Sequence, residues 1–397
     1  MRTWKICTIA DIGTVVGGAT PSTKKEENYD KGTIAWITPK DLAGFSGRFI
    51  SCGERNITEM GLKSCSAQLM PKHTVLFSSR APIGYIAIAA KEVCTNQGFK
   101  SVIPNENTDY MFLYYLLKYN RKNIERLGSG TTFKEVSAST MRGIQVKVPE
   151  SLNEQKAIAS VLSALDDKIE SNAKINDNLY AQARTITKEW ISKNTGDYEL
   201  SSLSAIALIN PDTYSSKEEW EYVNYLDTSS ITDGCISEIQ CIITSSEKLP
   251  SRARRKLAPN DIVFSTVRPN QRHLGIISNP LPNMLASTGF AVIRSKTSLV
   301  CNELIYLCLS ENEFIEKMQQ LAEQSTSTFP SIKPSDLGIC EIPCPKDDSS
   351  INFTKTLKSI FALIATNQQE NTYLANMRDA LLPKLMSGEI DVSSIQL

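Results

Sequence analysis

The sequence predicts a mixed α/β (α+β) fold of two similar domains, each followed by a long helix, with the two helices forming an antiparallel coiled coil. Three observations support this prediction. Residues 1–150 share short motifs with residues 199–348. Both stretches contain short apolar segments separated by turn residues. Each of the two stretches is followed by apolar residues at coiled-coil spacing. A chain of 397 residues is long enough for two domains of ordinary size.

The repeat becomes visible when the chain is compared with itself. Val75-Leu-Phe-Ser-Ser-Arg80 resembles Ile262-Val-Phe-Ser-Thr-Val-Arg268, and Asn96-Gln-Gly-Phe99 resembles Ser287-Thr-Gly-Phe290. Matches of this kind lie 187 to 196 residues apart, and this period is too long for a solenoid repeat. The predicted segments of the duplicated chain are a first domain (1–150), a first spacer helix (151–198), a second domain (199–348), and a second spacer helix with a C-terminal tail (349–397).

Each copy has the same predicted order of elements. Strands and turns come first, because segments rich in Val, Ile, Phe and Tyr alternate with Gly, Pro, Asn and Ser. A shorter helix follows, predicted over residues 110–125 in the first copy and 301–320 in the second. A loop then leads to a last strand, predicted over 143–148 and 338–342, and the long helix ends the copy.

The long helices carry apolar residues at alternating steps of three and four, from Ile158 to Trp190 and from Leu357 to Leu385. This spacing predicts a coiled-coil seam, and the alternative interpretation is an amphipathic helix that packs on its own domain. A helix of about 40 residues is roughly 60 Å long at 1.5 Å per residue, so a pair of them would hold the two domains apart.

Asparagines interrupt both stripes at matching positions, which are Asn172 and Asn176 in the first helix and Asn367 and Asn371 in the second. In an antiparallel pair, Asn172 is expected to face Asn371. Asn176 is expected to face Asn367 in the same way. Polar residues at seam positions lower stability but fix the register of a coiled coil, so these asparagines are candidates for that role.

A duplicated chain with a helical spacer is typical of a protein that reads a two-part DNA site. Dimeric DNA-binding proteins bind two half-sites, and the symmetry of the protein matches that of the site. Here one chain would supply both halves. Because the halves differ in sequence, they are expected to read two different short sequences across a gap that the helices set.

Charge supports this hypothesis in the first domain only. Residues 1–150 hold 20 Lys and Arg against 13 Asp and Glu, a net charge of +7, whereas residues 199–348 hold 13 against 19, a net charge of −6. A basic footprint is expected of a nucleic-acid-binding domain. The acidic surplus of the second domain either faces partner proteins or reflects weaker binding of the second half-site, with partner subunits supplying positive charge.

Three stretches carry a family resemblance. They are Leu374-Ala-Asn-Met-Arg-Asp-Ala-Leu-Leu-Pro-Lys-Leu-Met-Ser-Gly-Glu-Ile390, the run from Val148 to Ile158, and Gly128-Ser-Gly-Thr-Thr-Phe133. They resemble, in turn, the end of the second spacer helix, the start of the first spacer helix and the stretch that closes each target-recognition domain in the specificity subunit of type I restriction–modification systems. The start of the second helix departs from the first, because Ser349-Ser-Ile-Asn-Phe353 lacks a Glu-Gln pair.

The resemblance implies a function and a set of partners. Two target-recognition domains would each read one half of a split double-stranded DNA site. The paired helices would bind two methyltransferase (M) subunits, and restriction (R) subunits would join this core. The chain itself would perform no catalysis and hold no cofactor, because S-adenosylmethionine, ATP and Mg would bind the partner subunits.

The densest positive charge of the chain is Arg252-Ala-Arg254-Arg255-Lys256. We expect these side chains to bind phosphates, because Lys and Arg on phosphates supply most of the affinity for DNA. The alternative is a solvated surface loop.

Five further residues near the repeated motifs are candidates for DNA contact: Arg80, Gln97, Thr131, Thr132 and Arg268. Arg80 and Arg268 occupy matching places after an apolar strand, where either a guanine contact or a structural ion pair would explain the repetition. Gln97 could reach a base or form a turn. The two threonines, like Thr326 and Thr328 in the second copy, could bind phosphates or cap a turn.

Motifs for independent catalysis are missing from the sequence. Asn210-Pro211-Asp212 lacks the second proline of an adenine-methyltransferase motif, and no phosphate-binding loop for ATP occurs. Ten cysteines without a Cys-x-x-Cys pair, and only two histidines, do not predict a metal site. No apolar run reaches the roughly 18 residues of a membrane helix, so we expect a cytoplasmic protein.

Two other functions compete with sequence-specific DNA binding. One is a coiled-coil scaffold protein without DNA specificity, which would select no motif from random DNA. The other is a self-contained enzyme that cuts or methylates DNA, which would modify DNA as the purified chain alone.

Overall fold

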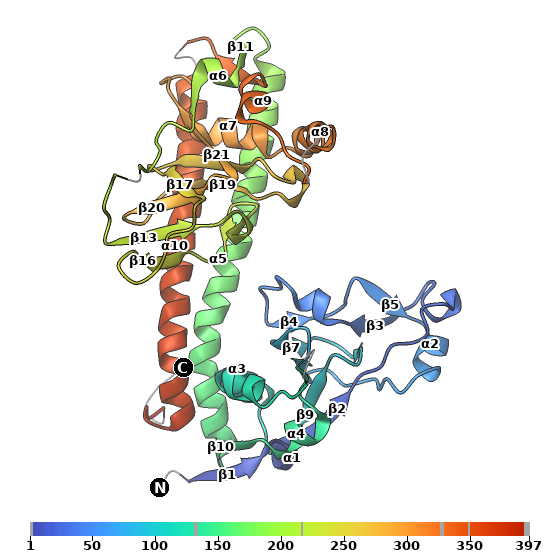
Figure 1. Cartoon of the computed structure of the whole chain (residues 1–397). Coiled ribbons are helices and arrows are strands. Elements are labelled where there is room, and N and C mark those ends of the chain that lie inside the picture. The colour runs from blue at the N-terminus through green and yellow to red at the C-terminus, as the bar shows by residue number, and fades with distance from the viewer. Residues whose placement is uncertain (1–2, 131–133, 216, 326–328, 348–349, 393–397) are drawn as a thin grey trace. The chain divides into compact units, whose positions relative to one another are not determined.

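The computed structural model describes residues 3–130, 134–215, 217–325, 329–347 and 350–392 (Figure 1). The chain forms two compact units, residues 1–171 with 370–397 and residues 172–369. Each unit combines a domain of strands and short helices with parts of two long helices, α5 (Leu152–Lys193) and α10 (Ile351–Ser387). The predicted α/β fold with two sheet-containing domains and two long helices is confirmed. No described helix is long and apolar enough to cross a membrane.

Short strands and helices make up the first domain. Its strands are β1 (Trp4–Thr8), β2 (Gly13–Gly17), β3 (Ile34–Ile37), β4 (Phe49–Ile50), β5 (Arg55–Ile57), β6 (Val75–Ser79), β7 (Ile83–Ala89), β8 (Cys94–Thr95), β9 (Lys100–Pro104) and β10 (Gln145–Pro149). Its helices are α1 (Ile9–Ile12), α2 (Glu59–Lys63), α3 (Tyr110–Arg126) and α4 (Ala138–Gly143), with 3₁₀ turns η1 (Glu26–Asn28) and η2 (Pro39–Leu42). Asp109 starts α3, because its carboxylate accepts a hydrogen bond from the Phe112 backbone NH.

The second domain has a similar series of elements. Its strands are β11 (Tyr198–Ser202), β12 (Ala207–Ile209), β13 (Tyr222–Leu226), β14 (Ile231–Thr232), β15 (Cys235–Ile236), β16 (Gln240–Ile243), β17 (Ala253–Lys256), β18 (Asp261–Ser265), β19 (Leu274–Ile277), β20 (Met284–Ser287), β21 (Phe290–Ser295) and β22 (Glu341–Pro345). Its helices are α6 (Leu203–Ile206), α7 (Asn302–Leu309), α8 (Asn312–Glu323) and α9 (Pro334–Gly338), with 3₁₀ turns η3 (Thr228–Ser230) and η4 (Pro269–Gln271).

The order of strands shows that the second domain repeats the topology of the first. The sheet β2-β9-β6-β7-β4 corresponds to the sheet β12-β21-β18-β19. The smaller sheet β5-β3-β8 corresponds to β16-β13-β20-β17, and β3 with β8, like β13 with β20, is a parallel pair. The two-stranded ribbons β1-β10 and β11-β22 complete the two copies. The repeat in the sequence is therefore a repeat of structure.

A strand buried on both faces lies at the centre of each domain. In β6, Val75 and Phe77 face α3, whereas Leu76 faces the smaller sheet. In β18, Phe264 faces the α7 side and Val263 faces the sheet that contains β13 and β20. Burial on both faces explains the nearly continuous apolar sequence of these strands, which belong to the repeated motifs.

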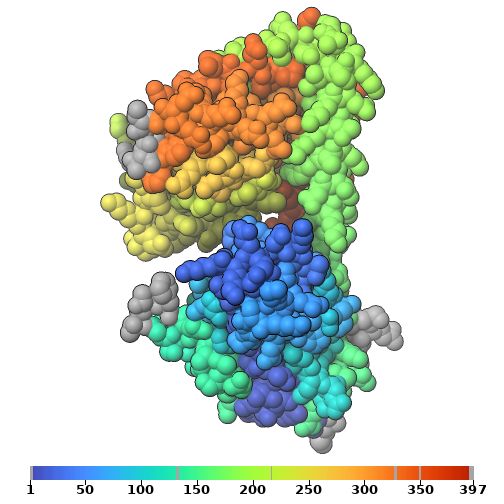
Figure 2. Space-filling model, turned by 90° about the vertical axis from the view of Figure 1, so that its right-hand side faces the viewer, coloured from blue at the N-terminus to red at the C-terminus, as the bar shows by residue number. Residues whose placement is uncertain are grey.

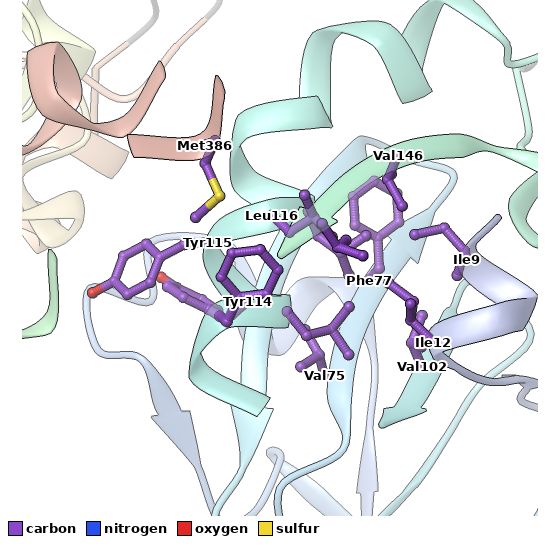
Figure 3. Packing of buried hydrophobic residues seen from close by; sticks show 14 of the residues in the cluster. Ile9, Ile12, Val75, Phe77, Val102, Tyr114, Tyr115, Leu116, Val146 and Met386 are labelled. Carbon is purple, nitrogen blue, oxygen red and sulfur yellow. The ribbon is translucent and has the colours of Figure 1, made fainter. Parts of the chain in front are cut away.

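The core of the first unit includes residues of the long helices. Val75, Phe77 and Val102 of the large sheet pack under α3, and Met386 of α10 points toward the tyrosines of α3 (Figure 3). Leu162 of α5 belongs to the same buried cluster. Burial of apolar surface stabilises by roughly 25 cal/mol per Å², so this shared core holds the domain to both helices.

The second unit is built in the same way. Ala183 of α5 and Phe361 of α10 share a buried cluster with Phe264 of β18. The rings of Trp190 in α5 and Phe353 in α10 stack with their centroids 4.5 Å apart, so the end of one helix lies beside the start of the other. Figure 2 shows the green surface of this part of α5 continuous with the orange surface of its domain.

Polar contacts fix the helix pair in the first unit. Asp166 of α5 accepts hydrogen bonds from Arg378 of α10 and from the Tyr115 hydroxyl of α3, both at 2.6 Å. Nearby, Arg48 is almost fully buried and pairs with Asp167 and, at 2.9 Å, with Glu170 of α5. A buried charge left without its partner is costly, so these contacts tie the domain to one position on the helices.

An asparagine pair lies in the seam of the second unit. Nδ2 of Asn367 donates to Oδ1 of Asn176 over 2.8 Å, and both side chains are buried. Asn172 is fully buried, and Asn371 of the first unit donates to the Ile169 carbonyl oxygen over 3.3 Å. The pairing of Asn172 with Asn371 would join the two units and stays a prediction, as does the role of the asparagines in fixing the register.

Two predicted elements differ in the structure. The helix expected over 301–320 is two helices, α7 and α8, because the backbone of Glu311 between them is extended, with φ −64° and ψ 142°. Nη2 of Arg272 donates to the Ser310 carbonyl oxygen at this break over 2.9 Å. The last strands, expected over 143–148 and 338–342, begin later, as β10 and β22. The short helices α4 and α9 occupy the start of each predicted segment.

The asparagine pair gives a test of seam specificity. Asn176→Leu or Asn367→Leu alone should lower the free energy of unfolding by about 1–3 kcal/mol, because the remaining buried amide loses its partner. The double substitution should recover most of this loss, since two leucines suit a seam, but should permit mispaired or associated species. Denaturant unfolding of all four proteins, with light scattering, measures both effects. Additive losses in the double variant would contradict the pairing.

Candidate nucleic-acid interface

Three segments meet at the end of the central strand in each domain. In the first domain, the Ser79 backbone NH donates to Gly98 over 2.7 Å, and the Val136 NH donates to Ser79 over 3.0 Å. In the second domain, the Thr266 NH donates to Gly289 and the Ile332 NH donates to Thr266, over 2.8 and 2.9 Å. We call these places strand-end junctions. The first consists of residues 79–80, 96–98, 100, 129–130 and 134–136, and the second of 252, 266–268, 287–289, 291 and 329–332.

A tight turn forms one part of each junction. Oδ1 of Asn96 accepts from the Gly98 NH over 2.9 Å, and Oγ of Ser287 accepts from the Gly289 NH over 3.2 Å. A Cβ at Gly98 would lie 2.9 Å from the ring of Pro39, so the turn approaches η2 too closely for a larger residue. The middle residues of the turns, Gln97 and Thr288, are both exposed.

Three charged side chains of the first junction are paired with one another. Nη1 of Arg80 lies 3.4 Å from one oxygen of Glu135, and Nζ of Lys100 lies 3.1 Å from the other. Lys100 also donates to Oγ of Ser79 over 3.4 Å. The exposed Gln97 accepts a hydrogen bond from the Thr20 hydroxyl. This junction therefore presents one partly neutralised guanidinium, one exposed amide and the exposed ammonium of Lys134.

The expectation that Arg80 and Arg268 occupy matching places is wrong by one residue. Since Ser79 and Thr266 make the same backbone hydrogen bonds, the residue that matches Arg80 is Val267. Arg268 matches Ala81, and both have a positive φ, of 47° and 52°. The similarity of the two sequence motifs concealed this offset, because only backbone pairing defines which positions are equivalent.

The second junction presents two exposed guanidinium groups. The carbonyl oxygen of Arg252 accepts from the Thr288 NH over 2.8 Å, which places this arginine beside the turn. The guanidinium of Arg268 lies 5.0 Å from the centre of the Phe329 ring. Neither arginine forms an ion pair with another described residue. The acidic second domain thus has unneutralised positive charge at this edge.

The remaining residues of the predicted basic cluster lie in β17 and have other contacts. Lys256 pairs with Glu218 over 2.5 Å and lies 5.4 Å from the Trp220 ring. The Lys256 ammonium and a backbone NH hold the pKa of Glu218 below its ordinary value. Nη1 of Arg254 donates to a backbone oxygen over 3.5 Å. Burial lowers the pKa of Arg255, and its buried Nε has no hydrogen-bond partner among the described residues.

The structure brings Arg80 and Gln97 together in one junction and Arg252 and Arg268 in the other. It does not bring Arg254, Arg255 and Lys256 into the exposed part of that junction. Thr131 and Thr132 lie outside the described residues, as do Thr326 and Thr328. No group of described residues has the three or more His, Cys, Asp or Glu that could hold a metal ion.

Sequence reasoning missed Glu135 and Lys100. Neither belongs to a charged run, and they lie 35 residues apart in the chain. Comparing the two copies position by position would have shown that charge at these places is present in the first copy only.

Known proteins with similar sequence or fold come from one family. The type I restriction modification DNA specificity domain matches residues 1–181. The chain is 32% identical to the type I restriction enzyme MjaIX specificity subunit of Methanocaldococcus jannaschii, over 99% of this chain and 95% of that protein. It is 31% identical to the EcoR124I/EcoR124II specificity subunit of Escherichia coli, over 41% of this chain and 40% of that protein. The crystal structure of a type I restriction–modification S subunit from M. genitalium has a similar fold, with a TM-score of 0.56 and 19% identity over 97% of this chain and 96% of that chain.

Substitution of the exposed arginines tests whether the second junction binds phosphates. Arg252→Ala and Arg268→Ala should each weaken binding to all DNA sequences and reduce the slope of log affinity against log salt by about 1. Lys256→Ala is the matched control, since this lysine is held by Glu218, and it should leave the slope unchanged. Fluorescence anisotropy across a salt series measures the slopes. Slopes equal to that of the parent chain for both arginine variants would remove them from the interface.

Proposed function

The chain belongs to the family of type I restriction–modification specificity subunits, whose role is DNA sequence recognition, and from this premise we propose that its two strand-end junctions read the two halves of a split double-stranded DNA site. The observation that carries this proposal is the duplication of the junction with different side chains. Arg80 and Gln97 lie in the first copy, and Arg252 and Arg268 in the second. The two junctions have the same backbone hydrogen bonds but different side chains. Different side chains are needed to read two different half-site sequences.

The helix pair is the spacer and the docking surface for the partners. Each unit contributes its own segment of paired α5 and α10, so the duplicated chain offers two similar surfaces. Two similar surfaces fit two copies of one partner. In this proposal two methyltransferase subunits bind the helices, and restriction subunits join that core.

Catalysis belongs to the partner subunits, which bind S-adenosylmethionine, ATP and Mg in the cytoplasm. The segment nearest to a methyltransferase motif has structural contacts in this chain. Oδ1 of Asn210 accepts from the Val292 NH over 3.0 Å, and Asp212 pairs with Arg294 over 2.9 Å. These contacts fasten the chain after β12 to β21, which supports a structural role for the segment.

Selection from a random DNA pool tests the proposed function. The full chain, co-expressed with the methyltransferase subunit of its own system, should enrich a motif of two short sequences separated by a fixed number of unspecified base pairs. Enrichment should persist when the methyl donor is left out, because recognition precedes catalysis. A pool without enrichment would support a scaffold without DNA specificity. Methylation or cleavage by the chain alone would support a self-contained enzyme.

A further inference from the structure

The first strand-end junction contains an ion cluster that has no counterpart in the second. Glu135 joins Arg80 and Lys100, with one carboxylate oxygen 3.4 Å from the guanidinium and the other 3.1 Å from the ammonium. Backbone pairing identifies the matching residues of the second domain, which are Ser331, Val267 and Ala291. None of these three carries a charge, so the cluster belongs to one copy of the repeat.

The Glu135 carboxylate is unexpected at a surface proposed to bind DNA, because its negative charge repels phosphates. Lys100 removes most of this repulsion. Its side chain is only 12% exposed, so its ammonium is too deep to follow a phosphate backbone and instead neutralises Glu135. Arg80 is 35% exposed, and the cluster as a whole keeps one positive charge, which Arg80 carries to the surface.

Glu135 holds Arg80 by one nitrogen. Among the described residues, Nε and Nη2 of Arg80 have no hydrogen-bond partner, so the guanidinium keeps donors for a ligand. Guanine presents O6 and N7 side by side in the major groove, and these two acceptors fit the parallel donors of an arginine. A carboxylate that restrains the guanidinium beforehand lowers the entropy lost when the contact forms.

We infer that Arg80 reads a guanine in the first half-site, and that Glu135, neutralised by Lys100, is the positioning residue that orients it. This inference rests on the proposed function, since it requires the first junction to bind DNA. The second junction has no such cluster, and its exposed Arg252 and Arg268 suit phosphates instead. The two junctions therefore differ in chemistry, because only the first holds a guanidinium oriented by a carboxylate, whereas the second adds two exposed guanidinium groups for phosphates.

Arg80→Lys and Glu135→Gln test the inference in the full chain co-expressed with its methyltransferase subunit. Lysine keeps the charge of Arg80 but loses the planar two-donor group. The preference for guanine at one position of the first half-site should fall roughly 5- to 100-fold in this variant. Glu135→Gln should weaken the same preference by a smaller factor. Sequencing of DNA selected from libraries randomised in both half-sites, together with salt titrations, measures these effects.

Two controls accompany the test. Lys91→Gln removes an exposed charge of the same domain outside the junction, and every base preference should stay as in the parent chain. The second half-site is the internal control for folding, because its motif should persist in both cluster variants. Loss of the second motif in Arg80→Lys would mean that this variant is misfolded. Glu135→Gln, which conserves size and shape, then tests the inference in its place.

Unchanged base preferences in both cluster variants would overturn the inference. It would also fall if Arg80→Lys leaves the preferences intact and changes only the salt dependence, since Arg80 would then bind a phosphate. A failure of the proposed function gives a different result. In that case the parent chain itself would select no split motif.

Discussion

The antiparallel pairing of α5 with α10 is the constraint on which the structure of both units depends. Each domain shares its buried core with residues of both long helices, so the helices are part of the domains and not merely a connection between them. The seam includes polar contacts, Asp166 with Arg378 in one unit and Asn176 with Asn367 in the other. Such contacts lower stability but are satisfied in one register only, and that register fixes where each strand-end junction lies on its own helix pair.

The sequence predicts the features of the fold that depend on long patterns. The seam spacing extends over four heptads, and the repeat extends over a whole domain, so both stand out above local variation. The division of residues 301–320 into α7 and α8 could not be predicted in this way. The break lies at Glu311, whose backbone is extended, and Arg272 bonds the Ser310 carbonyl oxygen there from 38 residues away in the sequence. Short helices such as α4 and α9 contain too few residues for a periodic pattern.

Some residues of the candidate site could also be predicted from the sequence, and others could not. Arg80, Gln97 and Arg268 were found because they lie next to repeated motifs, and the structure places each in a strand-end junction. The basic run from Arg252 to Lys256 was less informative, because the sequence does not show which of its side chains are already bound to other residues of the chain. Lys256 is held by Glu218, whereas Arg252 is exposed. The sequence alone does not show the role of Glu135, because its ion pairs with Arg80 and Lys100 form only in the folded chain.

Site-specific cross-linking to DNA tests the central claim, that each junction reads one half of the site. A photoreactive residue would replace Gln97 in one protein and Thr288 in another, since both occupy the exposed middle of equivalent turns. The account predicts that the adducts map to opposite halves of the selected motif. Adducts in the same half, or no adduct from either position, would contradict it.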